Sequence, residues 1–165
     1  MVIIIITGTP GTGKSTVANY IAAKFKFIKI NIKQIIRTHN LSECYDNKRK
    51  CNVVDEKKFA KAMEKEIVEN KGKNILLDSH LSHYISPKKV DLCIVCNCDI
   101  SVLNVRLKKR RYNKEKIREN LDCEIFDVCY NEALEFGHNV IKLNTTKGIN
   151  KQELNSIISS LTKKP

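Results

Sequence analysis

Eight residues near the start of the chain, from Gly8 to Ser15, read GTPGTGKS. Glycines at both ends of such a run, here Gly8 and Gly13, let the backbone curl around an anion without Cβ atoms in the way. The amides of Gly11 through Thr16 can then point inward, Lys14 supplies a mobile cation, and the Ser15 hydroxyl can ligate Mg²⁺. The pattern predicts a phosphate-binding loop (P-loop) for the β- and γ-phosphates of ATP, against the alternative of a coincidental glycine turn.

A carboxylate and a histidine follow an apolar run farther along the chain. Asp78 ends the run NILLD, and Ser79 and His80 come next. A carboxylate at the carboxyl edge of a parallel sheet lies beside the ligand crevice, so Asp78 can orient Mg²⁺ or its bound water. The alternative for Asp78 is a turn or N-cap role. His80 can orient a water, contact a phosphate, or only hydrogen-bond its own loop.

Arg106 and Arg110 are four residues apart in a predicted helix, so they project on one face. Both can reach nucleotide phosphates, where guanidinium groups neutralise the charge that phosphoryl transfer spreads. A solvated helix face rich in Lys and Arg has the same pattern. The chain contains no Asn-Lys-x-Asp stretch of the kind with which GTPases read their base, and an AAA-type motor would need a longer chain.

The chain has seven cysteines, and their odd number together with the lack of a signal peptide favours reduced thiols. Cys93, Cys96 and Cys98 resemble a metal site, but they lie in the apolar, strand-like run VDLCIVCNC. In a strand, residues three apart point to opposite faces, so Cys93 and Cys96 cannot hold one ion. We therefore expect no zinc, and buried thiols that pack as small apolar groups.

Short strand-like runs alternate with amphipathic helical stretches, which is typical of βαβ units with helices on both faces of a parallel sheet. Five strands are predicted, at about residues 2–6, 27–30, 74–78, 91–96 and 139–143. Helical stripes lie between or after them: Val17, Ile21 and Phe25; Phe59, Met63 and Ile67; Leu154, Ile157, Ile158 and Leu161. Asp55 and Asp99 stand where N-caps belong. The sequence thus predicts an α/β, three-layer P-loop NTPase fold.

Two polar inserts interrupt this pattern. The first, at about residues 31–54, contains a short helix and the turn-rich run ECYDNKRKCN. The second, at about residues 109–119, is the basic run KRRYNKEKIRE. Mobile lids have this composition, and so do ordinary surface loops.

A length of 165 residues fits a single domain, 1–165, with a composition typical of a soluble protein. The chain has no apolar stretch long enough for a membrane span, and we expect a cytoplasmic protein without membrane association. A formal charge of +12 favours polyanions such as nucleotides or RNA as partners. A solvated, lysine-rich surface is the alternative, because no RNA-binding signature is present.

Taken together, these motifs resemble the adenylate kinase isoenzyme 6 family, and the chain is similar to an archaeal-type member. This family comprises small, atypical nucleoside-monophosphate (NMP) kinases linked to ribosome maturation. The resemblance runs nearly end to end and rests on GTPGTGKST at 8–16, DSH at 78–80 and, above all, RRYNKEKIRENLDCEIFDVCYNEA at 110–133. It implies a five-stranded parallel sheet, an NMP-binding insert at about 31–54 and a short lid at about 109–119.

The resemblance also implies roles for single residues. The P-loop residues Gly11, Gly13, Lys14, Ser15 and Thr16 would bind the phosphates of ATP. Arg110 in the lid would contact ATP, and Lys147 would lie near the adenine. Arg37 would meet the acceptor phosphate, although its spacing fits a surface arginine equally well. Arg111 replaces a glycine common in the family, a change that would stiffen the lid hinge or add positive charge.

These inferences lead to one expected activity and one rival. The expected activity is transfer of the γ-phosphoryl group of Mg·ATP to a nucleoside monophosphate, most simply AMP, with Lys14, Asp78, His80 and Arg110 as catalytic residues and Ser15 and Asp78 on Mg²⁺. ATPase activity and a role in maturation of the small ribosomal subunit are also implied. The rival is a ribosome-assembly ATPase that binds a small-subunit ribosomal protein or pre-ribosomal RNA, with kinase activity secondary.

Overall fold

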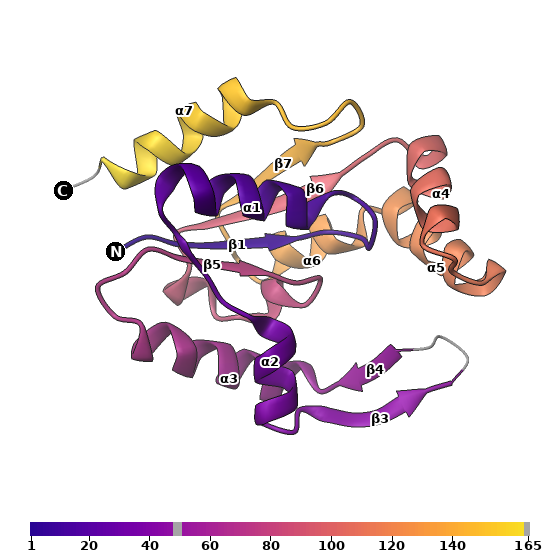
Figure 1. Cartoon of the computed structure of the whole chain (residues 1–165), viewed down its shortest axis with the longest axis horizontal. Helices are drawn as coiled ribbons and strands as arrows, with labels where there is room; N and C mark the ends of the chain where they lie inside the picture. The colour runs from indigo at the N-terminus through magenta and orange to yellow at the C-terminus, as the bar shows by residue number, and fades with distance from the viewer. Residues whose placement is uncertain (48–50, 164–165) are drawn as a thin grey trace.

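The computed structural model describes residues 1–47 and 51–163. Its centre is a five-stranded, wholly parallel sheet with the strand order β2-β5-β1-β6-β7 (Figure 1). The strands are β1 (Ile3–Thr7), β2 (Ile28–Lys29), β5 (Ile75–Asp78), β6 (Leu92–Asn97) and β7 (Val140–Asn144). All five predicted strands are confirmed, and so is the α/β P-loop fold class.

Seven α-helices surround the sheet in the described residues: α1 (Lys14–Phe25), α2 (Ile32–Thr38), α3 (Glu56–Glu69), α4 (Ile100–Lys109), α5 (Lys114–Ile125), α6 (Val128–Glu135) and α7 (Lys151–Thr162). Two short 3-10 turns, η1 (Ser82–Tyr84) and η2 (Pro87–Lys89), connect β5 to β6. Asp55 caps α3 as predicted, since its carboxylate accepts a 2.7 Å hydrogen bond from the Lys58 amide. Asp99 occupies the N-cap of α4 but makes no side-chain capping bond.

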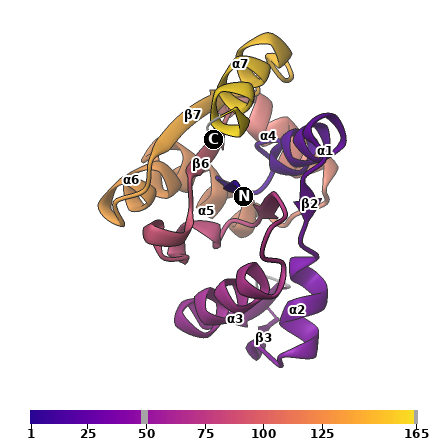
Figure 2. The same cartoon turned by 90° about the vertical axis from the view of Figure 1, so that its left-hand side faces the viewer.

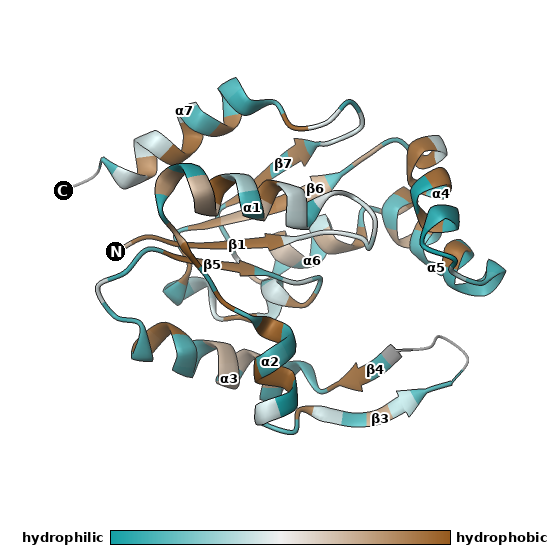
Figure 3. Cartoon of the chain, in the orientation of Figure 1, coloured by the Kyte–Doolittle hydropathy of each residue, from teal (hydrophilic) through white to brown (hydrophobic). Residues whose placement is uncertain are grey.

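Side chains alternate along each buried strand, and the sheet therefore divides the interior into two apolar cores. In β1, Ile3 and Ile5 face one core, whereas Ile4 and Ile6 face the other. Helices α1 and α7 cover one face, and α3 and α6 contribute to the other, so that the molecule has three layers (Figure 2). The apolar colour of the strands against the polar outer sides of the helices shows the same division (Figure 3).

The predicted helical stripes pack into these cores. Phe59, Met63 and Ile67 of α3 are buried on one side of the sheet. On the other side, the α1 and α7 stripes each combine buried with partly buried residues. Cys93 and Cys96 of β6 lie in opposite cores, which confirms that the two thiols point to different faces. Six cysteines among the described side chains carry free thiols.

The first predicted insert folds into more than the expected short helix. Helix α2 is present, and it is followed by an antiparallel hairpin of β3 (Ser42–Asp46) and β4 (Cys51–Val54) that the sequence did not predict. The strands β3 and β4 lie apart from the main sheet, and β3 exposes most of its side chains. The predicted range 31–54 also includes residues 48–50, which lie outside the described part of the chain.

The second insert is a short turn between two helices. Residues 109–119 comprise the end of α4, a turn, and the first half of α5. Leu103 and Leu107 of α4 form a small third core, against which Tyr112, Ile117 and Leu121 pack. The turn is thereby anchored to the rest of the molecule through an apolar contact rather than through the sheet. No helix in the described residues is long and apolar enough to cross a membrane.

Candidate active site

The P-loop joins β1 to α1, as the sequence predicts. Gly8 has a φ of +129°, and a Cβ atom there would collide with the carbonyl oxygen of Cys96. Gly13 has a φ of +88° and forms the N-cap of α1. Both conformations are in the region that favours glycine, so the two outer glycines of the motif are required by the backbone itself.

Lys14 folds back over this loop. Its Nζ donates hydrogen bonds to the carbonyl oxygens of Gly8, at 2.6 Å, and Thr9, at 3.0 Å. Burial lowers the pKa of Lys14; the negative charge of Asp78 opposes this effect, and the nearby Arg110 adds to it. Lys14, Asp78 and Arg110 are therefore close enough to interact electrostatically, although they come from three separate elements of the chain.

The amides of the loop differ in part from the expectation. The sequence predicted that the amides of Gly11 through Thr16 could all point inward. Two of them have partners inside the loop: the Thr12 amide donates to Thr9 O at 3.2 Å, and the Thr16 amide donates to Gly13 O at 3.0 Å. The expectation is wrong for these two amides, because the turn and the first turn of α1 use them. Ser15 and Thr16 expose their side chains on that first turn.

Asp78 lies at the carboxyl end of β5, opposite Ile6 of β1. Its carboxylate contacts Lys29 Nζ at 3.2 Å, and its side chain is only 7% exposed. Hydroxyl and carboxylate oxygens are the ligands that Mg²⁺ prefers, and Mg²⁺ usually takes one or two protein oxygens together with phosphates and waters. The hydroxyl of Ser15, on the first turn of α1, and the carboxylate of Asp78, at the end of β5, are oxygen donors of the kind that suits such an ion, and Lys29 competes for the carboxylate.

His80 is exposed, but protein atoms crowd its ring, and this desolvation is the largest cause that lowers the pKa of His80 to about 4. The positive charges of Lys14 and Lys116 lower it further. The imidazole is therefore neutral near pH 7. The backbone oxygen of His80 accepts a 3.2 Å hydrogen bond from the Thr7 hydroxyl, which ties the DSH segment to the end of β1.

His83 is a buried histidine beneath this site. Its Nδ1 lies 2.8 Å from Thr7 Oγ1, and its Nε2 lies 3.0 Å from Glu132 Oε2. Burial is the largest cause that lowers the pKa of His83 to about 4, whereas the pKa of Glu132 is raised. Both shifts favour the neutral forms, so the contact with Glu132 is better described as a polar contact than as an ion pair.

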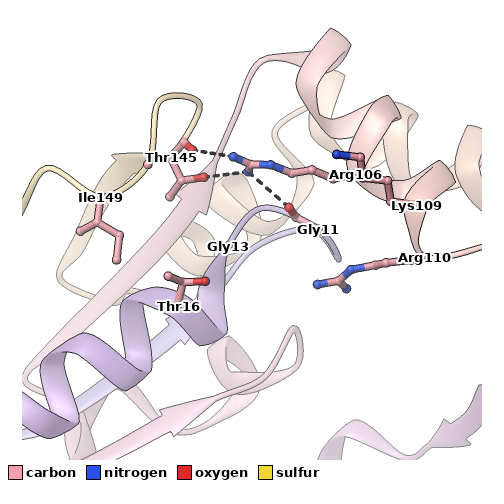
Figure 4. A pocket seen from close by; sticks show the side chains of 9 residues that line it. Gly11, Gly13, Thr16, Arg106, Lys109, Arg110, Thr145 and Ile149 are labelled. Carbon is pink, nitrogen blue, oxygen red and sulfur yellow. Dashed lines mark hydrogen bonds between the residues drawn. The ribbon is translucent and has the colours of Figure 1, made fainter.

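A cavity of about 440 Å³ opens beside the P-loop (Figure 4). Gly11, Gly13, Thr16 and Arg110 line it, and the guanidinium of Arg110 points into it. Lys147 lines an adjoining cavity of about 350 Å³, which shares Gly148 and Ile149 with the first. Five of the seven predicted donor-site residues thus line two neighbouring cavities, whereas Lys14 and Ser15 line neither.

Arg106 also lines the cavity beside the P-loop, and its guanidinium is held by oxygen atoms of the protein. Its Nη2 donates to Thr145 O at 2.9 Å and to Thr146 O at 3.4 Å. Its Nη1 donates to Gly11 O and to Thr145 Oγ1, each at 3.4 Å. The hydroxyl of Thr145 in turn donates to Thr12 O at 2.5 Å. Arg106 therefore connects the P-loop to the loop after β7.

Arg37, the predicted contact of the acceptor phosphate, lies away from the two cavities beside the P-loop. It lies exposed in the last turn of α2, and it does not line either of the cavities described above. Sequence reasoning missed Lys29 and Thr145. Thr145 directly follows a predicted strand, the same signal that singled out Asp78, whereas Lys29 is an exposed lysine within a predicted strand and carries no signal of its own.

A parallel sheet with a glycine loop after its central strand, a lysine folded over that loop and an aspartate at the next strand end is typical of P-loop nucleotide-binding proteins. A sugar kinase from Janibacter sp. HTCC2649 shares this fold, with a TM-score of 0.65 and 14% identity over 98% of this chain and 95% of that one. A family model described as an AAA domain matches residues 4–127.

Two relatives of known sequence are named adenylate kinase isoenzyme 6 homologs. The one from Dictyostelium discoideum is 41% identical over 130 residues, which cover 79% of this chain and 73% of the relative. The one from Caenorhabditis elegans is 35% identical over 132 residues, which cover 80% and 72%. The chain therefore belongs to this AAA-domain family and, by its relatives, to the adenylate kinase isoenzyme 6 family, and it is a kinase.

Proposed function

We propose that this kinase transfers the γ-phosphoryl group of Mg·ATP to AMP, so that ATP and AMP give two ADP. The observation that carries the proposal is the position of Lys14, which lies within electrostatic reach of both Asp78 and Arg110. Two cations and one carboxylate around a P-loop are the groups that phosphoryl transfer requires. The choice of AMP rests on the names of the relatives.

The donor nucleotide would lie along the two adjoining cavities. Gly11, Gly13, Lys14, Ser15 and Thr16 would hold the phosphates, with the positive N-terminal end of α1 directed at them. Arg110 would add a second cation from the lid. Lys147, in the neighbouring cavity, would lie against the adenine. Ser15 and Asp78 would hold Mg²⁺, Asp78 directly or through a water, and the ion would neutralise charge on the β- and γ-phosphates.

Catalysis would depend on alignment and charge rather than on a strong base. A phosphate oxygen of the acceptor is already a nucleophile near neutral pH. His80, neutral at that pH, would donate or accept one hydrogen bond at the site without adding positive charge. The acceptor phosphate would meet Arg37 of the first insert, and movement of the inserts at 31–54 and 109–119 would exclude water. Because Arg37 lies away from the P-loop cavities, this role requires the first insert to move.

The test uses Lys14→Ala, with Lys24→Ala as a matched control on the same helix. Lys24 is exposed in the last turn of α1, so its removal should leave ADP formation from ATP and AMP unchanged. Lys14→Ala should abolish ADP formation while its circular dichroism spectrum stays native. Full activity of Lys14→Ala would refute the site assignment. A panel of nucleoside monophosphates assayed with the unmodified protein identifies the acceptor.

The net charge of +12 favours a second candidate, a ribosome-assembly ATPase that binds a small-subunit ribosomal protein or pre-ribosomal RNA. ATP turnover measured with and without monophosphates separates the two functions. Stimulation by AMP supports the kinase, whereas turnover that no monophosphate stimulates, together with salt-dependent binding to pre-ribosomal particles, supports the assembly ATPase.

A further inference from the structure

A further cavity, separate from the two described above, lies between the P-loop, the DSH segment and helices α5 and α6, and its volume is about 270 Å³. Pro10 of the P-loop and His80 form part of its wall, and two cysteines, Cys123 and Cys129, form another part. The proposed phosphate transfer uses neither cysteine. Both thiols are free, and a small reagent can approach them through this cavity.

The two thiols lie close together across the bend between α5 and α6, and both line this cavity. Cys123 is partly exposed on α5, and Cys129 is buried on α6, where it belongs to the core under the sheet. The Cys129 thiol donates a hydrogen bond to Cys123. The bend that places them together contains Asp127, whose φ of +51° reverses the chain between the helices.

Cys123 also lies near the P-loop. The side chain of Thr9 lies near enough to its sulfur to lower the pKa of Cys123. The carbonyl oxygen of the same Thr9 accepts the 3.0 Å hydrogen bond from Lys14 Nζ and hydrogen bonds from the amide and hydroxyl of Thr12. Thr9 therefore lies between Cys123 and Lys14, so that a chemical change at Cys123 can affect the carbonyl oxygen that holds Lys14.

We propose that Cys123 and Cys129 form a reactive dithiol, with Cys123 as the nucleophile and Cys129 as the resolving thiol, which low-molecular-weight disulfides such as oxidised glutathione convert to an intramolecular disulfide. The proposal rests on the closeness of the thiols, their shared cavity and the exposure of Cys123, and it does not depend on the acceptor of the kinase reaction.

The reaction takes two exchange steps. The Cys123 thiolate attacks one sulfur of oxidised glutathione, the S–S bond of that molecule breaks, and one glutathione thiolate leaves. Cys129 then loses its proton to solvent and attacks the Cys123 sulfur, which releases the second glutathione. The protein loses two protons and two electrons, and one oxidised glutathione becomes two reduced ones.

The surroundings of Cys123 favour its thiolate. The hydrogen bond from Cys129 is the largest cause that lowers the pKa of Cys123 to about 7, with a further contribution from Thr9. Partial burial and the carboxylates of Glu124 and Glu132 act in the opposite direction. The same hydrogen bond raises the pKa of Cys129, which assigns that thiol to the second step.

Disulfide formation would remove the interaction between the Cys123 thiol and Thr9 and join α5 covalently to α6. The Thr9 carbonyl would then hold Lys14 less firmly, and we expect ATP to bind about fivefold more weakly to the oxidised protein. Reduction with dithiothreitol would restore the binding.

The test uses a Cys44→Ser/Cys51→Ser background, so that the exposed Cys44 and the neighbouring insert cysteine do not react. Trypsin cleaves after Arg118 and Lys142, so that Cys123 and Cys129 lie in one peptide, 119–142. After treatment with oxidised glutathione, this peptide should be lighter by two hydrogen atoms. With Cys129→Ala added it should instead carry one glutathione, and with Cys123→Ala added it should carry none.

Two further measurements complete the test. The pH at which iodoacetamide alkylation of Cys123 is half-maximal should lie near 7 and should rise in Cys129→Ala, which lacks the thiol donor. A glutathione adduct that persists on Cys123 when Cys129 is present would overturn the proposal. So would an unchanged alkylation midpoint in Cys129→Ala, or equal ATP affinity of the oxidised and reduced proteins.

Discussion

Replacement of Arg106 by Met should weaken both the fold and the binding of ATP. The guanidinium makes one short hydrogen bond, 2.9 Å to Thr145 O, and three contacts at 3.4 Å that contribute little. A hydrogen bond from a charged donor contributes about 1.5–3 kcal/mol, so we expect the free energy of unfolding to fall by about 2 kcal/mol. Methionine keeps most of the apolar stem, which isolates the polar contribution.

The effect on ATP follows from the same contacts. Arg106 holds Thr145 in place and also contacts Gly11 weakly, and both residues line the proposed donor cavity. In Arg106→Met, part of the binding free energy of ATP would be used to bring these two residues back into position. A loss of up to about 2 kcal/mol in binding free energy corresponds to a KM for ATP that is higher by up to about 30-fold. The KM for AMP should change little. Arg106→Lys should lie between the two proteins, because one ammonium cannot reproduce the fork of a guanidinium.

The measurements are urea unfolding and initial rates at varied ATP and AMP. Lys108→Met is the matched control, since Lys108 is an exposed cation on the same helix. Lys108→Met should change the free energy of unfolding by less than about 0.5 kcal/mol, and it should leave the KM for ATP unchanged. The reasoning is refuted if Arg106→Met and Lys108→Met are indistinguishable in both assays.

Three further predictions concern the backbone and one buried ring. Gly8→Ala should cost at least about 2 kcal/mol in urea unfolding, because of the φ of +129° and the collision with Cys96 O; a smaller loss would contradict the required glycine. Arg111 has a φ of +57° at the end of α4, so Arg111→Gly should raise the unfolding free energy by up to about 1 kcal/mol, whereas Lys109→Gly should lower it by about as much. The lowered pKa of His83, about 4 against the usual 6.5, means that the unfolded chain binds more protons between these values. The free energy of unfolding should therefore decrease as the pH falls from 6.5 to 4. An equally steep decrease in a His83→Gln variant would show that His83 does not cause it.

The sheet and the P-loop could be predicted because their signals are local. Buried parallel strands are short apolar runs, and Gly8 and Gly13 occupy backbone conformations that few other residues adopt. The hairpin β3–β4 was missed for the opposite reason. Its first strand, SECYD, has no buried face, so no alternation of apolar residues marks it.

The sequence singles out candidate residues for the site, but it does not show the contacts among them. Spacing placed Arg106 and Arg110 on one helix face, yet only the folded structure distinguishes them: Arg106 bonds to Thr145, and Arg110 points into the cavity. The pair of Lys29 and Asp78 likewise joins neighbouring strands that are far apart in the sequence. Contacts between residues on neighbouring strands depend on the strand order of the sheet, which cannot be read from a single sequence.

The partition of the interior by the sheet has a consequence for how this chain can vary. Helix α1, at the P-loop, packs through Val17 and Ile21 into one core, whereas α2, in the first insert, packs through Ile32 and Ile35 into the other. Substitutions without shared neighbours have additive effects on stability. Substitutions in the insert should therefore leave the packing of the helix that supports the phosphate loop nearly unchanged.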